Sequence, residues 1–250
     1  MATADETSDR VQREKEFHNE AFSDKRRSSL GKFYRVCRSM YREFESTLME
    51  QCAGKRVLEY GCGVTGRAFE IAKLSTHVVG VDISEVAVLQ SLEHAKHLGV
   101  QGKTEFIVMN AEAMTFPDAE FDVVFGSGIL HHLNLVAAAS ELQRVLKPNG
   151  VAIFTEPLGH NPVINLFRKL TPKLRTADEH PLLMRDIALL KQYFPGTEVS
   201  WHSLTTPYVA ILPKQLWKWA LPIAEAMDRM LFTIPWIRPW AWFAIIKMAK

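Results

Sequence analysis

The regular alternation of short β-branched segments with helical patterns constrains the fold of this chain more than any other feature, and it begins at residue 56. The predicted strands are short and apolar, and they cover residues 56–60, 77–82, 104–109, 122–126 and 151–156. Ser84 follows the second of them and can cap the next helix with its hydroxyl. Such alternation is typical of a parallel sheet with crossover helices. With two further strands at 197–204 and 240–246, we predict an α/β fold with a doubly wound, seven-stranded, mostly parallel sheet.

Helical patterns flank this sheet on both sides in the sequence. We predict an N-terminal helical lid over residues 1–50 and a sheet domain over residues 51–250. Within that domain, residues 207–238 read as a helical insertion before the last strand. Additions of this kind usually cover the ligand crevice of an α/β fold, so we expect both to lie near the binding site.

The charged residues are distributed unevenly along the chain. Residues 57–156 carry 6 Lys and Arg against 12 Asp and Glu, whereas residues 207–250 carry 6 against 2. The basic tail also contains five of the six tryptophans, which are Trp217, Trp219, Trp236, Trp240 and Trp242. An acidic centre and a basic, aromatic tail suggest that the two parts have different partners.

The tail and the ends of the chain indicate where the protein is found. Lys214, Lys218, Asp228, Arg229 and Arg238 interrupt the apolar tail, so it lacks the roughly 18 apolar residues of a spanning helix. The polar N-terminus is unlike a secretory or mitochondrial signal, and the three cysteines form no disulfide framework. We expect a cytoplasmic protein that is soluble or peripheral at a membrane surface.

A glycine-rich turn directly follows the first predicted strand. Residues 61–66 have the spacing GxGxxG, in which glycine permits a tight turn and close approach of a ligand to the backbone. Asp82 ends the second strand 21 residues after Gly61, where a carboxylate can accept hydrogen bonds from ribose hydroxyls. The glycine motif and Asp82 together predict a Rossmann-like nucleoside site. It leaves open whether the ligand is a nicotinamide dinucleotide or S-adenosylmethionine.

Five ordered sequence blocks decide between these two cofactors. They are Val57-Leu58-Glu59-Tyr60-Gly61-Cys62-Gly63, Val81-Asp82-Ile83-Ser84, Asn110-Ala111-Glu112, Phe116-Pro117-Asp118 with Phe121-Asp122, and Leu146-Lys147-Pro148-Asn149-Gly150. In these blocks the chain resembles the class I S-adenosylmethionine-dependent methyltransferases, especially the small-molecule branch that includes the ubiquinone/menaquinone C-methyltransferases. A dinucleotide dehydrogenase would share only the first two blocks.

The resemblance implies S-adenosyl-L-methionine as cofactor and a set of residues that hold it. These are Glu59, Gly61 and Gly63 at the methionine end, Asp82 at the ribose, Ile83 at the adenine face, Asn110 and Ala111 at the adenine edge, and Ser127 near the sulfonium. Many relatives have Asp where this chain has Asn110. An amide oxygen can still accept from the adenine amino group, so we expect binding to be retained.

Three neighbouring residues have simpler interpretations. Cys62 is expected to pack in the turn, because nothing near it in sequence would activate a thiolate. Glu112 is either a solvated loop acid or a cofactor contact. We expect His18 to be an exposed position of an N-terminal helix rather than a cofactor contact.

Candidate catalytic residues follow the fourth and fifth predicted strands, where a doubly wound fold opens its crevice. They are His131, His132, Glu156 and His160. An ordinary histidine pKa near 6.5 suits proton transfer at neutral pH, although the His pair can equally cap a helix or orient a loop. His180 either lines the acceptor pocket or fixes a turn. The spacing matches no zinc or iron pattern, so we predict no metal.

The tail gives the best clue to the methyl acceptor. Apolar residues recur there at helical spacing, namely Leu216, Trp219, Ile223, Met227 and Met230. Core packing is the first explanation of such a stripe, and an apolar acceptor pocket or contact with an anionic bilayer are the alternatives. Both alternatives favour a hydrophobic acceptor.

We therefore predict an S-adenosylmethionine-dependent methyltransferase that methylates carbon or oxygen of a small lipophilic acceptor, such as a quinone, lipid or polyketide. The alternatives are O-methylation of a sugar or polar metabolite, another S-adenosylmethionine-dependent group transfer on a quinone, and a non-catalytic cofactor-binding subunit. A nucleic-acid substrate is not expected, because the chain lacks a long basic patch and the Asn/Asp-Pro-Pro-aromatic motif.

Overall fold

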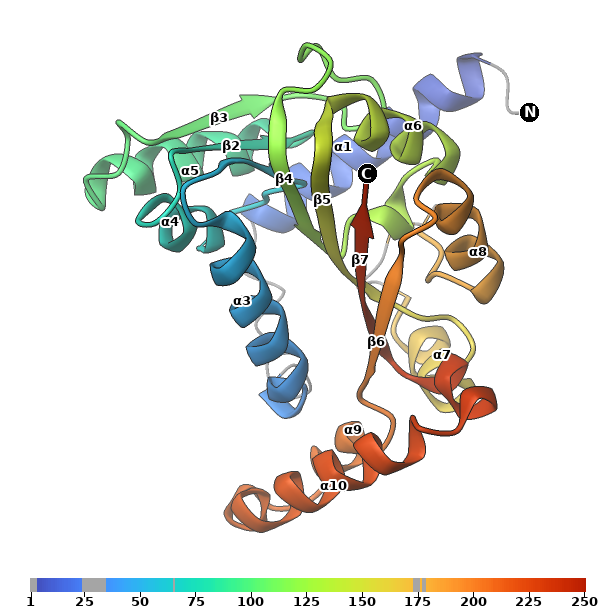
Figure 1. Cartoon of the computed structure of the whole chain (residues 1–250). Helices are drawn as coiled ribbons and strands as arrows, with labels where there is room; N and C mark the ends of the chain where they lie inside the picture. The colour runs from blue at the N-terminus through green and yellow to red at the C-terminus, as the bar shows by residue number, and fades with distance from the viewer. Residues whose placement is uncertain (1–3, 24–34, 65, 173–175, 177–178) are drawn as a thin grey trace.

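The computed structural model describes residues 4–23, 35–64, 66–172, 176 and 179–250 (Figure 1). Within these residues, seven strands form one sheet in the order β3-β2-β1-β4-β5-β7-β6. The strands are β1 Arg56–Tyr60, β2 His77–Asp82, β3 Thr104–Val108, β4 Phe121–Ser127, β5 Leu146–Pro157, β6 Glu198–His202 and β7 Phe243–Ala249. Every pairing is parallel except those of β7 with β5 and β6. The predicted mostly parallel, seven-stranded sheet is confirmed.

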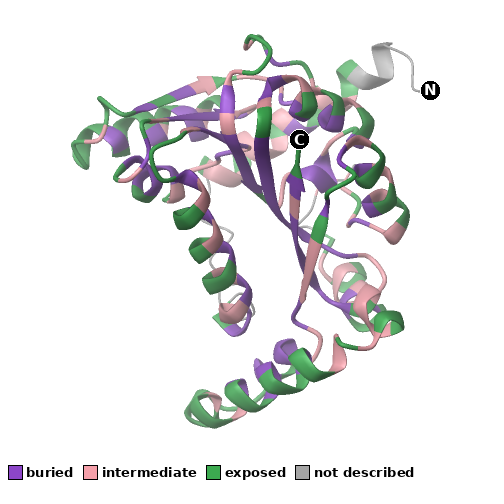
Figure 2. Ribbon diagram, in the orientation of Figure 1, coloured by how far each residue is buried: buried purple, intermediate pink, exposed green. Residues whose placement is uncertain are grey.

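Helices cover both faces of this sheet, and Figure 2 shows its buried strands between helices with exposed outer faces. The α-helices are α1 Ala4–Ser23, α3 Arg38–Cys52, α4 Arg67–Ala72, α5 Glu85–His97, α6 Leu135–Val145, α7 Pro162–Leu170, α8 Met184–Tyr193, α9 Thr206–Val209 and α10 Trp217–Leu231. The 3-10 helices are η2 Leu130–His132, η4 Lys214–Leu216 and η5 Pro235–Trp240. Ser84 caps α5 as its sequence position predicts, with its Oγ accepting from the amide of Ala87 at 3.2 Å.

Adjacent strand residues alternate between two cores, one on each face of the sheet. Val57 of β1 belongs to the cluster under α3 and α4, while its neighbour Leu58 belongs to the cluster under α6 and α8. The same alternation holds for Val123 and Val124 of β4. Strands buried on both faces are typical of parallel sheets and hold β1 and β4 rigidly in the centre.

The order of the strands determines where a ligand can bind. The chain runs from β1 outward through β2 to β3, then returns to β4 on the opposite side of β1. The crossover connections therefore diverge at β1 and β4, which opens a crevice beyond the carboxyl ends of these strands. The glycine turn after β1 and the loop containing η2 after β4 both start at this point.

The apolar stripe of α10 does not pack in the core as first expected. Its members Trp219, Ile223, Met227 and Met230 are exposed, and Trp219 keeps 67% of its surface accessible. The buried side of α10 is formed by other residues, including Glu225. No helix among the described residues is both long and apolar enough to cross a membrane.

Candidate active site

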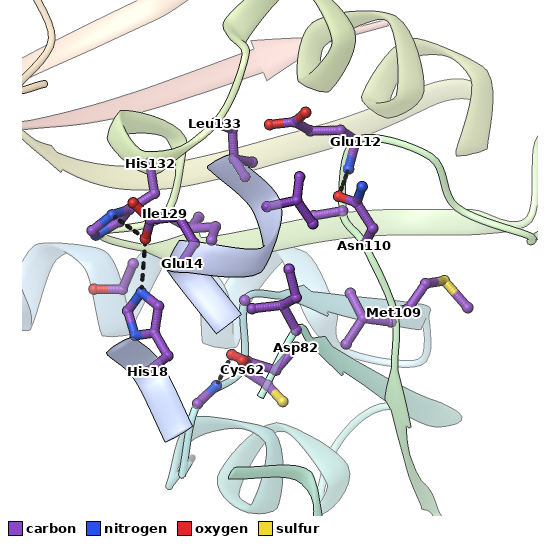
Figure 3. A pocket seen from close by; sticks show the side chains of 18 of the residues that line it. Glu14, His18, Cys62, Asp82, Met109, Asn110, Glu112, Ile129, His132 and Leu133 are labelled. Atoms are coloured by element: carbon purple, nitrogen blue, oxygen red, sulfur yellow. Dashed lines mark hydrogen bonds and ion pairs between the residues drawn. The ribbon is translucent and has the colours of Figure 1, made fainter. Parts of the chain in front are cut away.

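A pocket lies at the carboxyl ends of β1, β2 and β4 and is covered by α1 (Figure 3). Its lining residues are Arg10, Val11, Glu14, His18, Phe22, Gly61, Cys62, Gly63, Val64, Val81, Asp82, Ile83, Met109, Asn110, Ala111, Glu112, Ser127, Gly128, Ile129, His132 and Leu133. The structure thus brings together seven of the eight cofactor-binding residues proposed from the sequence. The exception is Glu59, which is buried within β1 and does not line the pocket.

The glycine turn forms the floor of the pocket. Gly61 and Gly63 have φ angles of 71° and 53°, a backbone conformation that other residues rarely adopt. The amides of Gly61 and Cys62 both donate to the carbonyl oxygen of Val81 at 2.9 Å, which ties the turn to β2. A Cβ at Gly61 would come within 2.7 Å of the Ile129 side chain. Glycine is therefore required here both by the backbone conformation and by the close approach of Ile129. Thr65 of the same motif lies outside the described residues.

Two backbone amides hold the Asp82 carboxylate in place. Oδ2 accepts from the amide of Gly63 at 2.7 Å, and Oδ1 accepts from the amide of Ser84 at 2.9 Å. Each carboxylate oxygen has a second lone pair and can accept a further hydrogen bond. The geometry is suited to a ligand with two adjacent hydroxyls, such as a ribose.

The loop after β3 forms the wall next to Asp82. Oδ1 of Asn110 accepts from the amide of Glu112 at 2.9 Å, which stabilises the loop, and its second lone pair can accept from a ligand. Below the loop, the hydroxyl of buried Tyr60 donates to the carbonyl oxygen of Ala111 at 2.6 Å. These bonds fix the position that the resemblance assigns to the adenine edge.

Helix α1 contributes a set of lining residues that the sequence analysis did not assign. Arg10, Glu14, His18 and Phe22 follow one another at intervals of four and share the face of α1 that covers the pocket. The expectation that His18 is an exposed helix position is therefore wrong. Regular spacing by four in a charged N-terminal helix was the signal for this face.

Arg10 fastens α1 across the pocket. One of its terminal nitrogens lies 2.6 Å from both carboxylate oxygens of Glu112, and the other donates to the carbonyl oxygen of His132 at 2.9 Å. Glu112 also accepts from the amide of Asn134 at 2.7 Å. Because its side chain is almost fully buried, Glu112 is not the solvated loop acid that the sequence left open.

Glu14 lies between two histidines on the wall of the pocket (Figure 3). Its Oε2 is 3.2 Å from Nδ1 of His132 and 3.4 Å from Nε2 of His18. Burial alone would raise the pKa of Glu14, but its contacts with His132, His18 and Thr176 lower that pKa well below the ordinary value. The carboxylate is therefore ionised throughout the physiological range.

His132 is held as a neutral imidazole beside this carboxylate. Burial lowers its pKa below the usual 6.5, and the neighbouring Glu14 opposes the shift only in part. A neutral ring next to an anion can accept a proton and be stabilised once it carries the charge. Of the four candidate catalytic residues, His132 is the one that lines the pocket.

The other three candidates make structural contacts away from the lining. Glu156 is fully buried, and its Oε1 accepts from the amides of Ile129 and Leu130, both at 2.9 Å. Its Oε2 lies 2.7 Å from Nδ1 of His131, which donates to the carboxylate. Nε2 of His160 accepts from the amide of Met184 at 3.0 Å. These contacts favour roles in positioning the loop around η2 and the start of α8.

Two further side chains complete the description of the candidate residues. His180 donates its backbone amide to the carbonyl oxygen of His131 at 2.9 Å, so it joins two loops, while Asp178 beside it lies outside the described residues. Ser127 borders the pocket, and its Oγ accepts from the hydroxyl of Thr155 at 2.8 Å.

Cys62 occupies the turn as a packed, protonated side chain. It is 6% exposed, and burial raises the pKa of its thiol well above the usual value, with the charges of Glu59 and Asp82 adding to the effect. A thiol with a raised pKa is a poor nucleophile. Packing therefore explains Cys62, as the sequence suggested.

The side chains of Glu14, His18 and His132 also form a donor set that a metal ion could use, with ligand atoms within 4.8 Å of one another. The distances between them, 3.2 and 3.4 Å, are those of contacts between the imidazoles and the carboxylate. The absence of a metal remains a prediction.

The strand order and the crevice at β1 and β4 define a Rossmann-like fold. Its ligand site lies beyond the carboxyl ends of the parallel strands. Residues 58–154 match a protein family described as "Methyltransferase domain". The match covers 97 of the 250 residues, and it shows that the centre of the chain is similar to a methyltransferase domain.

Curated relatives share this central region. A sterol 24-C-methyltransferase of Gibberella zeae is 39% identical over 100 residues, which are 39% of this chain and 26% of that protein. A phosphoethanolamine N-methyltransferase of Triticum aestivum is 35% identical over 111 residues, which are 44% of this chain and 22% of that protein. The matched part of the chain thus spans about a quarter of the length of these relatives.

Solved structures show the same fold over a larger part of the chain. The geranyl diphosphate C-methyltransferase from Streptomyces coelicolor has a TM-score of 0.58 at 16% identity. The likeness covers 85% of this chain and 78% of that one. At this identity the comparison shows the fold, and the likeness extends beyond residues 58–154 to the helices and strands around the central region.

Proposed function

We propose that the pocket binds S-adenosylmethionine and that the chain transfers its methyl group to carbon or oxygen of a small lipophilic acceptor. The observation that carries this proposal is the pairing of two features in one pocket. Asp82 and the glycine turn provide a nucleoside site, and the neutral His132 beside ionised Glu14 provides a proton acceptor. Helix α1 acts as the lid of this site.

The residues of the pocket fit this cofactor. Asp82 can receive the ribose hydroxyls, the Gly61 and Gly63 backbone leaves room for the methionine part, and Asn110 can accept from the adenine amino group. When bound, the cofactor supplies an electrophilic methyl group on a positively charged sulfur. A scaffold without catalytic function would not require a carboxylate fixed at the ribose position.

The chain's own residues have three tasks in such a reaction. α1 covers the pocket and excludes water. The closed pocket holds the acceptor in line with the methyl group for displacement. His132 accepts the proton that the acceptor loses as its new bond to methyl forms, while the electrons of the broken bond remain on sulfur. Glu14 stabilises the imidazolium that results.

The relatives support an acceptor with a long apolar part. Sterols and geranyl diphosphate are named for two of the similar proteins, and both are isoprenoid in skeleton. A prenylated quinone, as in the ubiquinone/menaquinone branch, belongs to the same chemical class. The similarity to a phosphoethanolamine N-methyltransferase favours a polar acceptor as the second candidate.

Incubation with methyl-labelled S-adenosylmethionine and separate lipid and polar extracts tests the acceptor class. We expect the label to enter the organic-solvent fraction, and mass spectrometry of the labelled product then identifies the acceptor. Label confined to polar metabolites would replace the lipophilic proposal by the polar one. No label in either fraction, with intact cofactor binding, would contradict the enzyme proposal itself.

Replacing Glu14 by Gln tests the proton acceptor through the pH dependence of transfer. Glu14 raises the pKa of His132, so its neutralisation is expected to lower that pKa and to move the acid limb of the kcat/KM profile to lower pH. Loss of imidazolium stabilisation should also reduce kcat about 10- to 100-fold. The exposed Glu20 of the same helix provides the control, because Glu20→Gln should leave both quantities unchanged. An unshifted acid limb in Glu14→Gln would rule out His132 as the base.

A further inference from the structure

Helix α10 buries a side that contains its two acidic residues and exposes an apolar stripe. Its two acidic residues face inward, because Glu225 and Asp228 are 8% and 7% exposed. Arg38 of α3 contacts the Glu225 carboxylate at 2.8 Å, and the Asp228 carboxylate accepts from the amide and hydroxyl of Thr205 at 2.7 and 2.6 Å. Together with the buried Leu221, these polar contacts hold α10 to the protein, and its apolar stripe is left to solvent.

The outward side of α10 and the following η5 both expose large apolar side chains, which we together call the tryptophan face. It is defined by Trp219, Ile223, Met227, Met230, Trp236 and Trp240, all of which are exposed. Trp236 keeps 72% of its surface accessible. Exposed apolar residues grouped in this way mark interaction surfaces, whereas single ones are ordinary.

The exposed charged side chains of the segment that carries the tryptophan face are positive. Residues 204–238 contain two acidic residues, Glu225 and Asp228, and both are buried. Lys214, Lys218 and Arg229 are exposed on the same segment. An apolar surface with aromatic residues and a basic margin is complementary to the surface of an anionic bilayer.

The tryptophan face lies at the same edge of the sheet as the pocket. η5 leads into β7, whose first residue Phe243 pairs with Pro157 at the carboxyl end of β5. Figure 1 accordingly shows α10 beyond the end of the sheet where β5 finishes. α7 begins beside η5, because Asn161 donates to the carbonyl oxygen of Trp240 at 2.8 Å, and it exposes Leu166 and Leu170.

We propose that the tryptophan face docks the protein on the surface of an anionic lipid bilayer, with the aromatic side chains at the level of the headgroups and the basic residues against lipid phosphates. Docking through this edge brings the pocket end of the sheet to the membrane. The proposal adds to the proposed function a way for a lipid acceptor to reach the pocket from the membrane, and only this part rests on that function. The docking itself requires neither cofactor nor transfer.

Co-sedimentation of the full chain with vesicles tests the proposal. We expect binding to vesicles of equal parts phosphatidylglycerol and phosphatidylcholine at low salt, and weaker binding to phosphatidylcholine alone or at high salt. The double variant Trp219→Ser with Ile223→Ser should reduce the partition coefficient at least about tenfold. Leu89→Ser on α5 with Leu98→Ser directly after α5 is the matched control, since these leucines are similarly exposed and lie outside the tryptophan face.

Charge reversal separates the electrostatic contribution. Lys218→Glu should weaken binding to anionic vesicles by about fivefold or more, whereas Lys191→Glu on α8 should not.

The proposal is overturned if the wild-type chain stays in the supernatant or if the tryptophan-face variant binds as well as its control. It is also overturned if sedimentation velocity shows a dimer that this variant abolishes, because a second copy would then cover the face. Vesicle binding is read without S-adenosylmethionine, so failure of methyl transfer and failure of docking are distinct results.

Discussion

Replacement of Asp82 by Ala is expected to weaken binding of S-adenosylmethionine at least about hundredfold. A hydrogen bond to a charged group contributes about 1.5–3 kcal/mol, and the carboxylate is placed to accept two from the ribose. Losing both corresponds to at least two decades in the dissociation constant, because about 1.4 kcal/mol is tenfold. Asp82 also accepts from the amides of Gly63 and Ser84, so its loss loosens the turn around the ligand. Isothermal titration calorimetry measures the change.

Two variants separate recognition of the ribose from damage to the fold. Asp82→Asn keeps one acceptor oxygen and should have an intermediate affinity. Asp118→Ala removes an exposed carboxylate outside the pocket and should bind as the wild type does. Thermal unfolding of each variant establishes that it is folded. A folded Asp82→Ala protein with unchanged affinity would show that the ribose is held elsewhere.

The part of the site that could be predicted from sequence is the part built by local backbone rules. The turn after β1 needs glycine because its φ angles are positive, and Asp82 ends the next strand, so both leave a recognisable pattern. Parallel strands bring their carboxyl ends to one edge of the sheet. The resemblance to class I methyltransferases assigned the neighbouring Asn110 and Ser127, and both line the same pocket.

A helical lid over residues 1–50 was expected, but the residues of it that meet the pocket were not predictable in the same way. Arg10 and Glu14 belong to a helix that contacts the pocket through side chains far away in sequence, such as Glu112 and His132. Nothing in a helical pattern states which distant element it meets. The four-residue spacing from Arg10 to Phe22 could have indicated a common face, but the partner of that face is visible only in the fold.

The tail illustrates a second limit of periodicity. Helical spacing in α10 correctly identified one apolar stripe, yet it does not say whether that stripe faces the protein or solvent. Here the buried side is held by Arg38 at Glu225 and by Thr205 at Asp228, both contributed by other segments. Core packing was the reasonable first expectation and was wrong for this reason.

The buried pair of Glu156 and His131 shows a third limit. Both residues follow strands at the crevice, which made them candidates for catalysis. Their side chains instead turn toward each other beneath the loop that carries His132, where Glu156 has three hydrogen-bond donors around it. The position of a residue after a strand predicts that it lies at the crevice edge of the sheet. The direction of its side chain depends on the packing around it.

This arrangement gives Glu156→Ala a large expected effect on stability. The variant leaves the amides of Ile129 and Leu130 and the ring of His131 buried without their acceptor. Each such loss costs about 1–3 kcal/mol, so the free energy of unfolding should fall by about 3–5 kcal/mol. Urea unfolding followed by circular dichroism measures it. Glu105→Ala is the control, because that carboxylate is half exposed on β3 and its removal should change stability by less than about 0.5 kcal/mol.

Glu156→Gln distinguishes a positioning role from a catalytic one. The amide oxygen can still accept from both backbone amides, and the neutral His131 ring can accept from the new NH₂ group in its other tautomer. We therefore expect Gln to restore more than half of the stability that Ala loses and to retain measurable transfer, because the loop that holds His132 keeps its shape. A Gln variant as stable as the wild type but without any transfer would show instead that the carboxylate takes part in the reaction. Equal stability of the Ala variant and the Glu105 control would contradict the buried hydrogen bonds themselves.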